Sequence, residues 1–212
     1  MPFMEEALDW PLARLLPVMQ KRIMEDCRYH GIPTLKNPLD FWVYQEIVWE
    51  TRPDIIVEIG NLYGGSTLAL AHMCDVLGAG RIIGVDSNHA EIHESVKAHP
   101  RIGLITGGAC QVAPQVQREL AAARSVLIID DSLHTYEHTL NVLQTYAEFV
   151  TVDNYFIVED GICHHGLDVG PEPGPYEAVD AFIRTNKNFI IDRNKENFGI
   201  TWNPKGYLKR IS

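Results

Sequence analysis

The chain has 212 residues, of which 46% are hydrophobic, and a formal net charge of −10. This length suits a single domain, residues 1–212, with a sizeable buried core. The acidic residues are spread along the chain and no basic patch stands out. A nucleic acid or an anionic membrane is therefore not an expected partner.

The sequence also favours a cytoplasmic protein. Its start, Met1–Glu6, has acids but no basic region of the kind that opens a signal peptide. The longest apolar runs have the length of strands, not of membrane spans. The cysteines, Cys27, Cys74, Cys110 and Cys163, are far apart and form no CxxC pair, as in reduced cytoplasmic proteins.

Residues 1–50 predict an N-terminal helical segment. A helix is expected over Leu12–Tyr29, ended by Gly31-Ile32-Pro33. Asn37 followed by Pro38 is typical of an N-cap with proline at the first helical position, so a second helix is expected over Leu39–Glu50.

Strand-like and helix-like segments then alternate. The predicted strands are Ile55–Ile59, Arg81–Val85, Ile102–Ile105, Ser125–Asp130 and Tyr155–Glu159. The predicted helices between them are Ser66–Leu77, Asn88–His99, Val112–Ala123 and Tyr136–Phe149. This alternation predicts an α/β fold, a Rossmann-like doubly wound sheet that is mostly parallel with helices on both faces.

The last part of the chain departs from this alternation. One more helix is expected over Tyr176–Thr185. The short apolar runs Phe189–Asp192 and Phe198–Trp202 predict a C-terminal antiparallel hairpin at the end of the sheet. Gly161–Pro175 is rich in proline and glycine, and we interpret it as a long active-site loop.

A glycine-rich turn follows the first predicted strand of this alternation. In an open α/β sheet the ligand lies at the carboxyl ends of the strands, which is where Glu58, Gly60, Gly64, Gly65 and Ser66 fall. Asp86 ends the next strand at about the distance expected for an acid that binds ribose hydroxyls. The pattern predicts a nucleotide-type cofactor, although its spacing is not GxGxxG. The alternative is a tight turn without a ligand.

Adjacent acids end two further strands. Asp130 and Asp131 follow the fourth predicted strand, and Glu159 and Asp160 follow the fifth. In a sheet ordered 3-2-1-4-5 these strands are neighbours, so their acids converge beside the glycine turn. Clustered carboxylates repel one another unless a cation joins them, and oxygen ligands suit Mg²⁺ or Ca²⁺. The sequence predicts a metal site here; the alternative is two solvated acidic loops.

Histidines and a lysine complete the set of candidates. His134 to His138 matches H-x-x-E-H, the pattern of one class of zinc proteases. Thr135 is a plausible N-cap that leaves His134 outside the helix, so we interpret His134 as a general base near Asp131. The loop pair His164-His165 contacts substrate or solvent. Lys36 contacts an anionic group of the substrate, or is an ordinary surface lysine.

Together these segments resemble the class I S-adenosylmethionine-dependent methyltransferases, and more narrowly the family of cephalosporin hydroxylases and rhamnosyl O-methyltransferases. The resemblance runs from about Pro33 to Arg210. The residues that carry it are Lys36–Asp40, Val57–Gly60, Gly64–Ser66, Asp131–His134, Tyr155–Asp160 and Asn203–Leu208. It implies a seven-stranded sheet whose last strand is antiparallel, and a homo-oligomer.

The resemblance also implies roles for individual residues. The cofactor S-adenosylmethionine would be held by Glu58, Gly60, Tyr63, Gly64, Gly65, Ser66, Asp86, Gly107 and Ala109. The related metal-dependent O-methyltransferases suggest that Asp131, Glu159 and Asp160 bind the metal, Mg²⁺, with Asp130 as the competitor for the first position. Those of the catechol type end the fifth strand with Asp-Asn, whereas this chain has Glu159-Asp160.

The resulting hypothesis is a Mg²⁺-dependent O-methyltransferase that acts on a hydroxyl of a small molecule, a sugar or another natural product. His134 or Lys36 would take the proton. Two alternatives stay open at this point. One is a non-catalytic protein that binds S-adenosylmethionine beside a cephalosporin-type oxygenase. The other is an NAD-dependent oxidoreductase, which shares the turn and the ribose acid.

Overall fold

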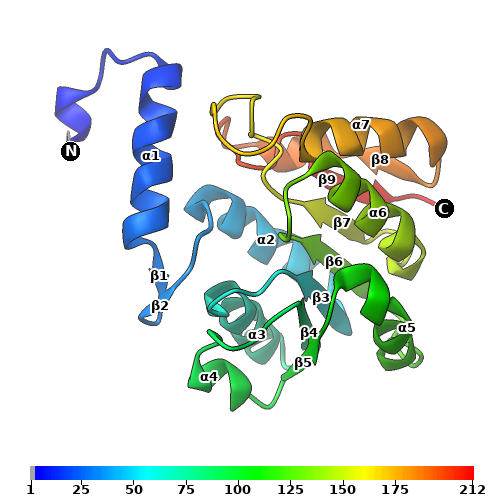
Figure 1. Cartoon of the computed structure of the whole chain (residues 1–212). Coiled ribbons are helices and arrows are strands. Elements are labelled where there is room, and N and C mark those ends of the chain that lie inside the picture. The colour runs from blue at the N-terminus through cyan, green and yellow to red at the C-terminus, as the bar shows by residue number, and fades with distance from the viewer. Residues whose placement is uncertain (1–2) are drawn as a thin grey trace.

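A computed structural model describes residues 3–212 and shows a large central sheet with helices on both faces (Figure 1). Its seven strands are ordered β5-β4-β3-β6-β7-β9-β8. The strands are β3 (Ile55–Ile59), β4 (Arg81–Asp86), β5 (Ile102–Thr106), β6 (Val126–Asp130), β7 (Tyr155–Val158), β8 (Phe189–Ile191) and β9 (Tyr207–Arg210). The first five are parallel, and β9 is antiparallel to both of its neighbours. The predicted fold class and the order 3-2-1-4-5 are confirmed.

The helices follow the expected alternation. They are α1 (Leu12–Asp26), α2 (Pro38–Thr51), α3 (Gly65–Leu77), α4 (Glu94–Lys97), α5 (Ala109–Glu119), α6 (Tyr136–Tyr146) and α7 (Pro175–Thr185), with short 3₁₀ turns at Met4–Glu6, Ala147–Phe149 and Arg193–Glu196. α2 and α3 pack on one face of the sheet, and α5, α6 and α7 pack on the other. Within residues 3–212 no helix is long and apolar enough to span a membrane.

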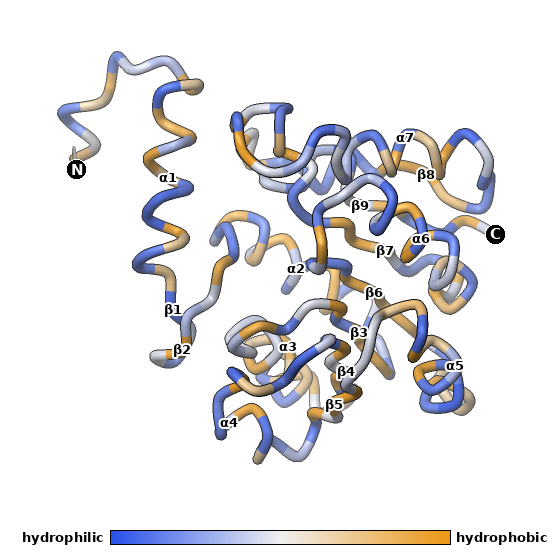
Figure 2. Tube along the Cα trace, viewed as in Figure 1, coloured by the Kyte–Doolittle hydropathy of each residue, from blue (hydrophilic) through white to orange (hydrophobic). Residues whose placement is uncertain are grey.

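The sheet is hydrophobic because both of its faces are covered. All five residues of β3 and all five of β6 are buried, and the tube through the central strands is mostly coloured as hydrophobic (Figure 2). A strand with helices on both sides has no polar face, which is why these runs lack the alternation of a half-exposed strand. Their carboxyl ends are left open for loops that carry polar side chains.

The N-terminal segment stands beside this core. Helix α1 packs through Leu16 and Ile23 against Ile162, Leu167 and Trp202, and it lies apart from the sheet in Figure 1. The predicted helix over Leu12–Tyr29 is too long, because it ends at Asp26. A small antiparallel pair follows it, β1 (Arg28–Tyr29) and β2 (Ile32–Pro33).

Two other sequence predictions are wrong. The helix expected over Asn88–His99 is confined to α4, because Asp86 accepts a hydrogen bond from the Asn88 N–H and Asn88 accepts one from the Ala90 N–H. Such local bonds compete with helical ones. Phe198–Trp202 is not a strand. The antiparallel partner of β8 is β9, which is inserted between β7 and β8.

Gly206 is a packing requirement of this edge and gives a stability prediction. A Cβ at Gly206 would lie 2.0 Å from the carbonyl oxygen of Val158, whereas one at Gly103 would meet nothing closer than 3.9 Å. We expect Gly206→Ala to lower the free energy of unfolding by at least about 2 kcal/mol through overpacking. Gly103→Ala, measured beside it by urea denaturation, should change stability by less than about 0.5 kcal/mol. Equal stability of the two variants would contradict this packing.

Candidate active site

A cavity of about 630 Å³ opens at the carboxyl ends of the parallel strands. Most of the residues predicted for the site line it: Lys36, Gly60, Tyr63, Gly65, Ser66, Asp86, Gly107, Ala109, Asp131, His134 and Asp160. Glu58, Gly64 and Glu159 are the exceptions among the predicted residues, and they lie behind the wall. The sheet therefore brings together, at one edge, residues that are distant in the chain. Lys36 and Asp160, for example, are 124 positions apart.

The glycine turn lets separate segments approach closely. Gly60 has a φ of +89°, and a Cβ there would lie 2.0 Å from the carbonyl oxygen of Asp131. A Cβ at Gly65 would lie 1.9 Å from Oγ1 of Thr34, so the segment that leads to Lys36 crosses the start of α3. Gly64 has a different role. A Cβ added at Gly64 would point away from the cavity and contact the side chain of Val96.

Asp86 is held as a carboxylate at the end of β4. Its Oδ2 accepts the backbone N–H groups of Asn61, at 2.8 Å, and Leu62, at 3.2 Å. Burial disfavours the charged form, but these hydrogen bonds and one from Asn88 outweigh it and lower the pKa of Asp86. A charged acid therefore lies on the wall of the cavity, next to the glycine turn.

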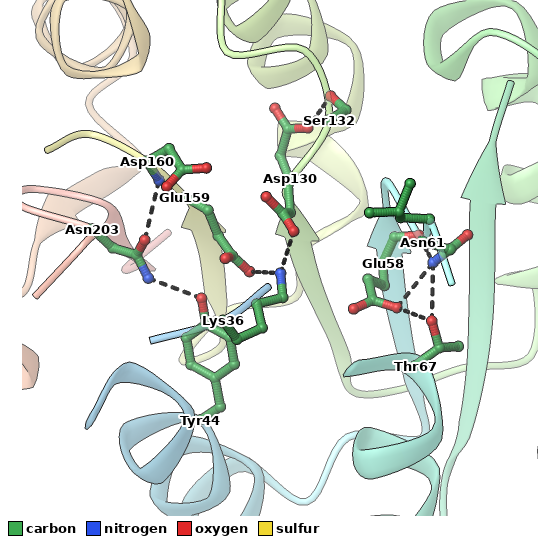
Figure 3. Close-up of polar contacts among 12 residues, drawn as sticks. Lys36, Tyr44, Glu58, Asn61, Thr67, Asp130, Ser132, Glu159, Asp160 and Asn203 are labelled. Carbon is green, nitrogen blue, oxygen red and sulfur yellow. Dashed lines mark hydrogen bonds and ion pairs between the residues drawn. The ribbon is translucent and has the colours of Figure 1, made fainter. Parts of the chain in front are cut away.

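Glu58 is fully buried beneath this turn (Figure 3). Its Oε2 accepts hydrogen bonds from Asn61 and Thr67. Its Oε1 has no well-aligned hydrogen bond among the described residues, although the hydroxyl of Ser66 lies near enough to the carboxyl group to favour its charged form. Burial outweighs these contacts and raises the pKa of Glu58.

The acids of β6 and β7 meet around Lys36. The ammonium Nζ lies 2.5 Å from Oδ2 of Asp131 and 2.5 Å from Oε1 of Glu159, and only 6% of the lysine side chain is exposed. Burial alone would lower the pKa of Lys36, but the charges of Asp131 and Glu159 raise it instead. Lys36 is therefore a permanent cation between two acids (Figure 3), which makes it a poor proton acceptor.

A second grouping lies on the cavity side of these acids. Nε2 of His134 is 3.0 Å from Oδ2 of Asp160 and 3.4 Å from Oδ1 of Asp131, and ligand atoms of all three residues lie within 4.8 Å of one another. The same nitrogen is buried and has no well-aligned hydrogen bond among the described residues. Two carboxylates and an imidazole that face one point fit a divalent cation.

The structure separates the two adjacent acids of β6. Asp131 faces the cluster, whereas Oδ1 of Asp130 accepts a hydrogen bond of 2.6 Å from Ser132. Burial raises the pKa of Asp130 to about 7. Asp131 is therefore the acid available to a cation. Glu159, the third predicted ligand, is bound to Lys36, and its role as a metal ligand stays a prediction.

The other histidines take different places. Thr135 caps α6, and its hydroxyl accepts the N–H of His138, so His134 precedes the helix as expected. His138 contacts Ser132 and, among the described residues, does not belong to the group that Asp131, His134 and Asp160 form. In the loop, His165 stacks on Tyr176 and His164 contacts Asp168, and neither lines the cavity.

The outer part of the cavity is lined by residues of several segments. Ile162, Cys163, Leu167 and Val169 belong to Gly161–Pro175, the segment predicted as an active-site loop, and they do lie at the cavity. The sequence did not predict Gln20, Met24, Leu35 and Trp202, which also line it. These four residues come from α1, from the segment after β2 and from the loop before β9, and no local motif marks them.

Comparisons with known proteins agree with this arrangement. The sequence model described as "Rhamnosyl O-methyltransferase/CmcI" matches residues 21–211. A curated rhamnosyl O-methyltransferase of Mycobacterium tuberculosis is 31% identical over 189 residues, which cover 86% of this chain and 77% of that protein. The corresponding protein of Mycobacterium leprae is 29% identical over 191 residues, covering 85% and 81%.

Solved structures show the same fold. A CmcI structure with magnesium and S-adenosylmethionine has a TM-score of 0.71 at 23% identity and covers 96% of this chain and 86% of its own. An O-methyltransferase from Bacillus cereus, in complex with S-adenosylhomocysteine, has a TM-score of 0.57 at 17% identity, covering 88% and 86%.

The fold and the family match define an S-adenosylmethionine-dependent O-methyltransferase. Within that class, the chain belongs to the rhamnosyl O-methyltransferase/CmcI family. This assignment favours the methyltransferase hypothesis over an NAD-dependent oxidoreductase and over a protein without catalytic activity.

The acids around His134 predict an unusual titration. Burial lowers the pKa of His134, but the nearby carboxylates of Asp131 and Asp160 raise it to about 9. In metal-free protein, histidine NMR should show His134 losing its proton near pH 9, while the pKa of His138 is lowered by burial. The charged form of His134 then stabilises the fold fully below its unfolded pKa of about 6.5, and this contribution is lost as pH rises towards 9. A His134 titration at or below pH 6.5 would contradict the arrangement.

Proposed function

We propose that this O-methyltransferase moves the methyl group of S-adenosylmethionine to a hydroxyl of a neutral sugar or other natural product, with the help of Mg²⁺. The single observation that carries the proposal is the meeting of Asp131, His134 and Asp160 on the wall of the cavity that the glycine turn also lines. A cofactor site and a site for a hydroxyl group are thereby adjacent.

The cofactor would lie over the glycine turn. Asp86 is charged and half-buried beside Gly60 and Tyr63, which suits the ribose hydroxyls as donors. Glu58 is buried beneath the same turn, behind the cavity wall, and would reach the ammonium group of the cofactor through water, with Oε1 as the acceptor. Gly107 and Ala109 line the side where β5 ends, in keeping with a place for the adenine.

Asp131 and Asp160 are the residues that would hold Mg²⁺, since both offer carboxylate oxygens at one point of the wall. When bound, the ion would lower the pKa of the acceptor hydroxyl and fix its direction. Glu159 stays a candidate third ligand while Lys36 balances its charge.

The transfer itself needs alignment and the removal of one proton. The acceptor oxygen forms a bond to the methyl carbon as the carbon–sulfur bond of the sulfonium breaks, in line. His134 is the favoured base once Mg²⁺ is bound, because its Nε2 faces the same point as the two acids and the charge of the ion would offset the carboxylates that raise its pKa in metal-free protein. Lys36 is not favoured, since two carboxylates hold it as a cation.

The charge of the cavity supports a neutral acceptor. Among the described residues that line the cavity, Lys36 is the one lysine or arginine, and its charge is balanced by Asp131 and Glu159. A phosphate or carboxylate on the substrate would therefore find no lysine or arginine free to pair with it on the described cavity wall. The relatives named rhamnosyl O-methyltransferases point to a rhamnoside as the first acceptor to test.

The expected homo-oligomer stays a prediction, which light scattering would test.

Two variants test the two halves of the site against each other. Asp86→Ala should weaken S-adenosylhomocysteine binding about 10- to 100-fold in calorimetry, because a charged hydrogen-bond acceptor is lost. Asp131→Asn should leave that affinity within about threefold, yet lower kcat at least about 100-fold.

EDTA should abolish transfer by the wild-type protein and Mg²⁺ should restore it. Transfer that is insensitive to both EDTA and Asp131→Asn would remove the carboxylate role.

The acceptor prediction has its own assay. A neutral methyl rhamnoside and rhamnose 1-phosphate are offered separately with the same cofactor. We expect the neutral glycoside to have at least about tenfold higher kcat/KM, because burying an unpaired anion beside acids costs more than about 1.4 kcal/mol. A preference for the phosphate would contradict a neutral acceptor.

A further inference from the structure

Asn203 lies behind the acids of β7 and belongs to no helix or strand. It is 1% exposed. Its Oδ1 accepts the backbone N–H of Asp160 at 3.2 Å, and its Nδ2 donates to the hydroxyl of Tyr44 at 2.9 Å (Figure 3). The side chain therefore joins the end of β7 to helix α2, which lies on one face of the sheet.

The backbone of Asp160 needs such support. Its φ of +56° lies in the left-handed region, a backbone conformation that residues other than glycine rarely adopt. A strained conformation of this kind persists only where its surroundings fix it. The next residue, Gly161, is closely packed as well, because a Cβ added there would lie 2.7 Å from the carbonyl oxygen of Pro204. Asn203 and Pro204 thus pack directly against Asp160 and Gly161.

The second contact of Asn203 leads into the interior of the protein. Tyr44 is 1% exposed, and its hydroxyl accepts the Nδ2 hydrogen bond of Asn203. Through one amide group, Asn203 therefore connects the backbone of Asp160 with a buried side chain of α2.

Asp40 anchors the segment that carries Asn203. Its Oδ1 accepts the hydroxyls of Thr201, at 2.5 Å, and Tyr207, at 2.9 Å, and its Oδ2 accepts the N–H of Trp202 at 2.8 Å. Because Asp40 belongs to α2, the position of residues 201–203 is set from the same helix as that of Tyr44.

We propose that Asn203 is a positioning residue, whose amide holds Asp160 so that its carboxylate faces Asp131 across the cavity wall. The inference rests on the proposed function, in which Asp160 binds a divalent cation. The residue type follows from the contacts: one small side chain must accept from an N–H group and donate to a hydroxyl. An amide does both, whereas a carboxylate cannot donate and an aliphatic chain can do neither.

Asn154 offers a matched control. It is also 1% exposed, its Nδ2 donates to Ser125 at 3.1 Å, and its Oδ1 accepts the N–H of Tyr155 at 2.9 Å. It lies at the amino end of β7, on the side of the sheet away from the cavity. Replacing either asparagine by leucine removes a buried amide with two hydrogen bonds, so the two variants should lose similar thermal stability.

The experiment measures Mn²⁺ binding by EPR and S-adenosylhomocysteine binding by calorimetry on the full-length chain, with no catalytic turnover. Asn203→Leu should weaken Mn²⁺ binding about 10- to 100-fold, the usual effect of losing a partner of a metal ligand. Asn154→Leu should leave it within about twofold. Both should bind S-adenosylhomocysteine like the wild-type protein, which shows that they are folded.

Tyr44→Phe is the second variant, because it removes one anchor of the Asn203 amide with little change in volume. It should weaken Mn²⁺ binding at least about threefold, and it keeps the inference testable if Asn203→Leu does not fold. Unchanged Mn²⁺ affinity in Asn203→Leu, or in Tyr44→Phe where the leucine variant is unfolded, overturns the positioning role alone. A wild-type protein that binds no Mn²⁺ refutes the proposed function itself, and the positioning role with it.

Discussion

The structure depends on the balance of charge around Lys36. Buried carboxylates repel one another and lose hydration, so a group of them is stable only with a cation in contact. The ammonium of Lys36 supplies that contact to Asp131 and Glu159, at 2.5 Å each. Removing one partner of such a buried pair typically costs about 3–5 kcal/mol, because the remaining charge is left unbalanced.

This balance makes the N-terminal part of the chain a component of the site. Lys36 comes from the segment between β2 and α2, outside the parallel strands. The same segment crosses the start of α3, where only a glycine at position 65 leaves room for Thr34. Helix α1 then covers the outer cavity with Gln20 and Met24. The cofactor turn, the acids and the acceptor side are therefore held together by residues 16–36.

The sequence was informative where a local pattern has one physical cause. The run Ile55–Ile59, the glycine turn and Asp86 predicted β3, the start of α3 and the end of β4, because a strand covered on both faces must be apolar and a close approach needs glycine. The meeting of Asp131 with Glu159 and Asp160 also followed from strand order alone. The family resemblance, stated from short motifs, is confirmed.

The sequence was less informative where contacts between distant segments determine the structure. Phe198–Trp202 has the composition of a strand, but the Trp202 N–H is bound to Asp40 and its side chain belongs to the same buried cluster as Leu16. Nothing near Asn203 in the sequence shows that it contacts Tyr44 and Asp160. Lys36 was predicted at the site, yet its neutralisation by two acids, which makes it a poor base, appears only in three dimensions.

The central claim is that acids from two neighbouring strands face one cation beside the cofactor. Crystals grown with S-adenosylhomocysteine and Mn²⁺ would test it directly through the anomalous signal of manganese. The account predicts one strong peak per chain, in contact with the carboxylates of Asp131 and Asp160. No peak in that cavity, or a peak bound only by residues elsewhere on the chain, would contradict it.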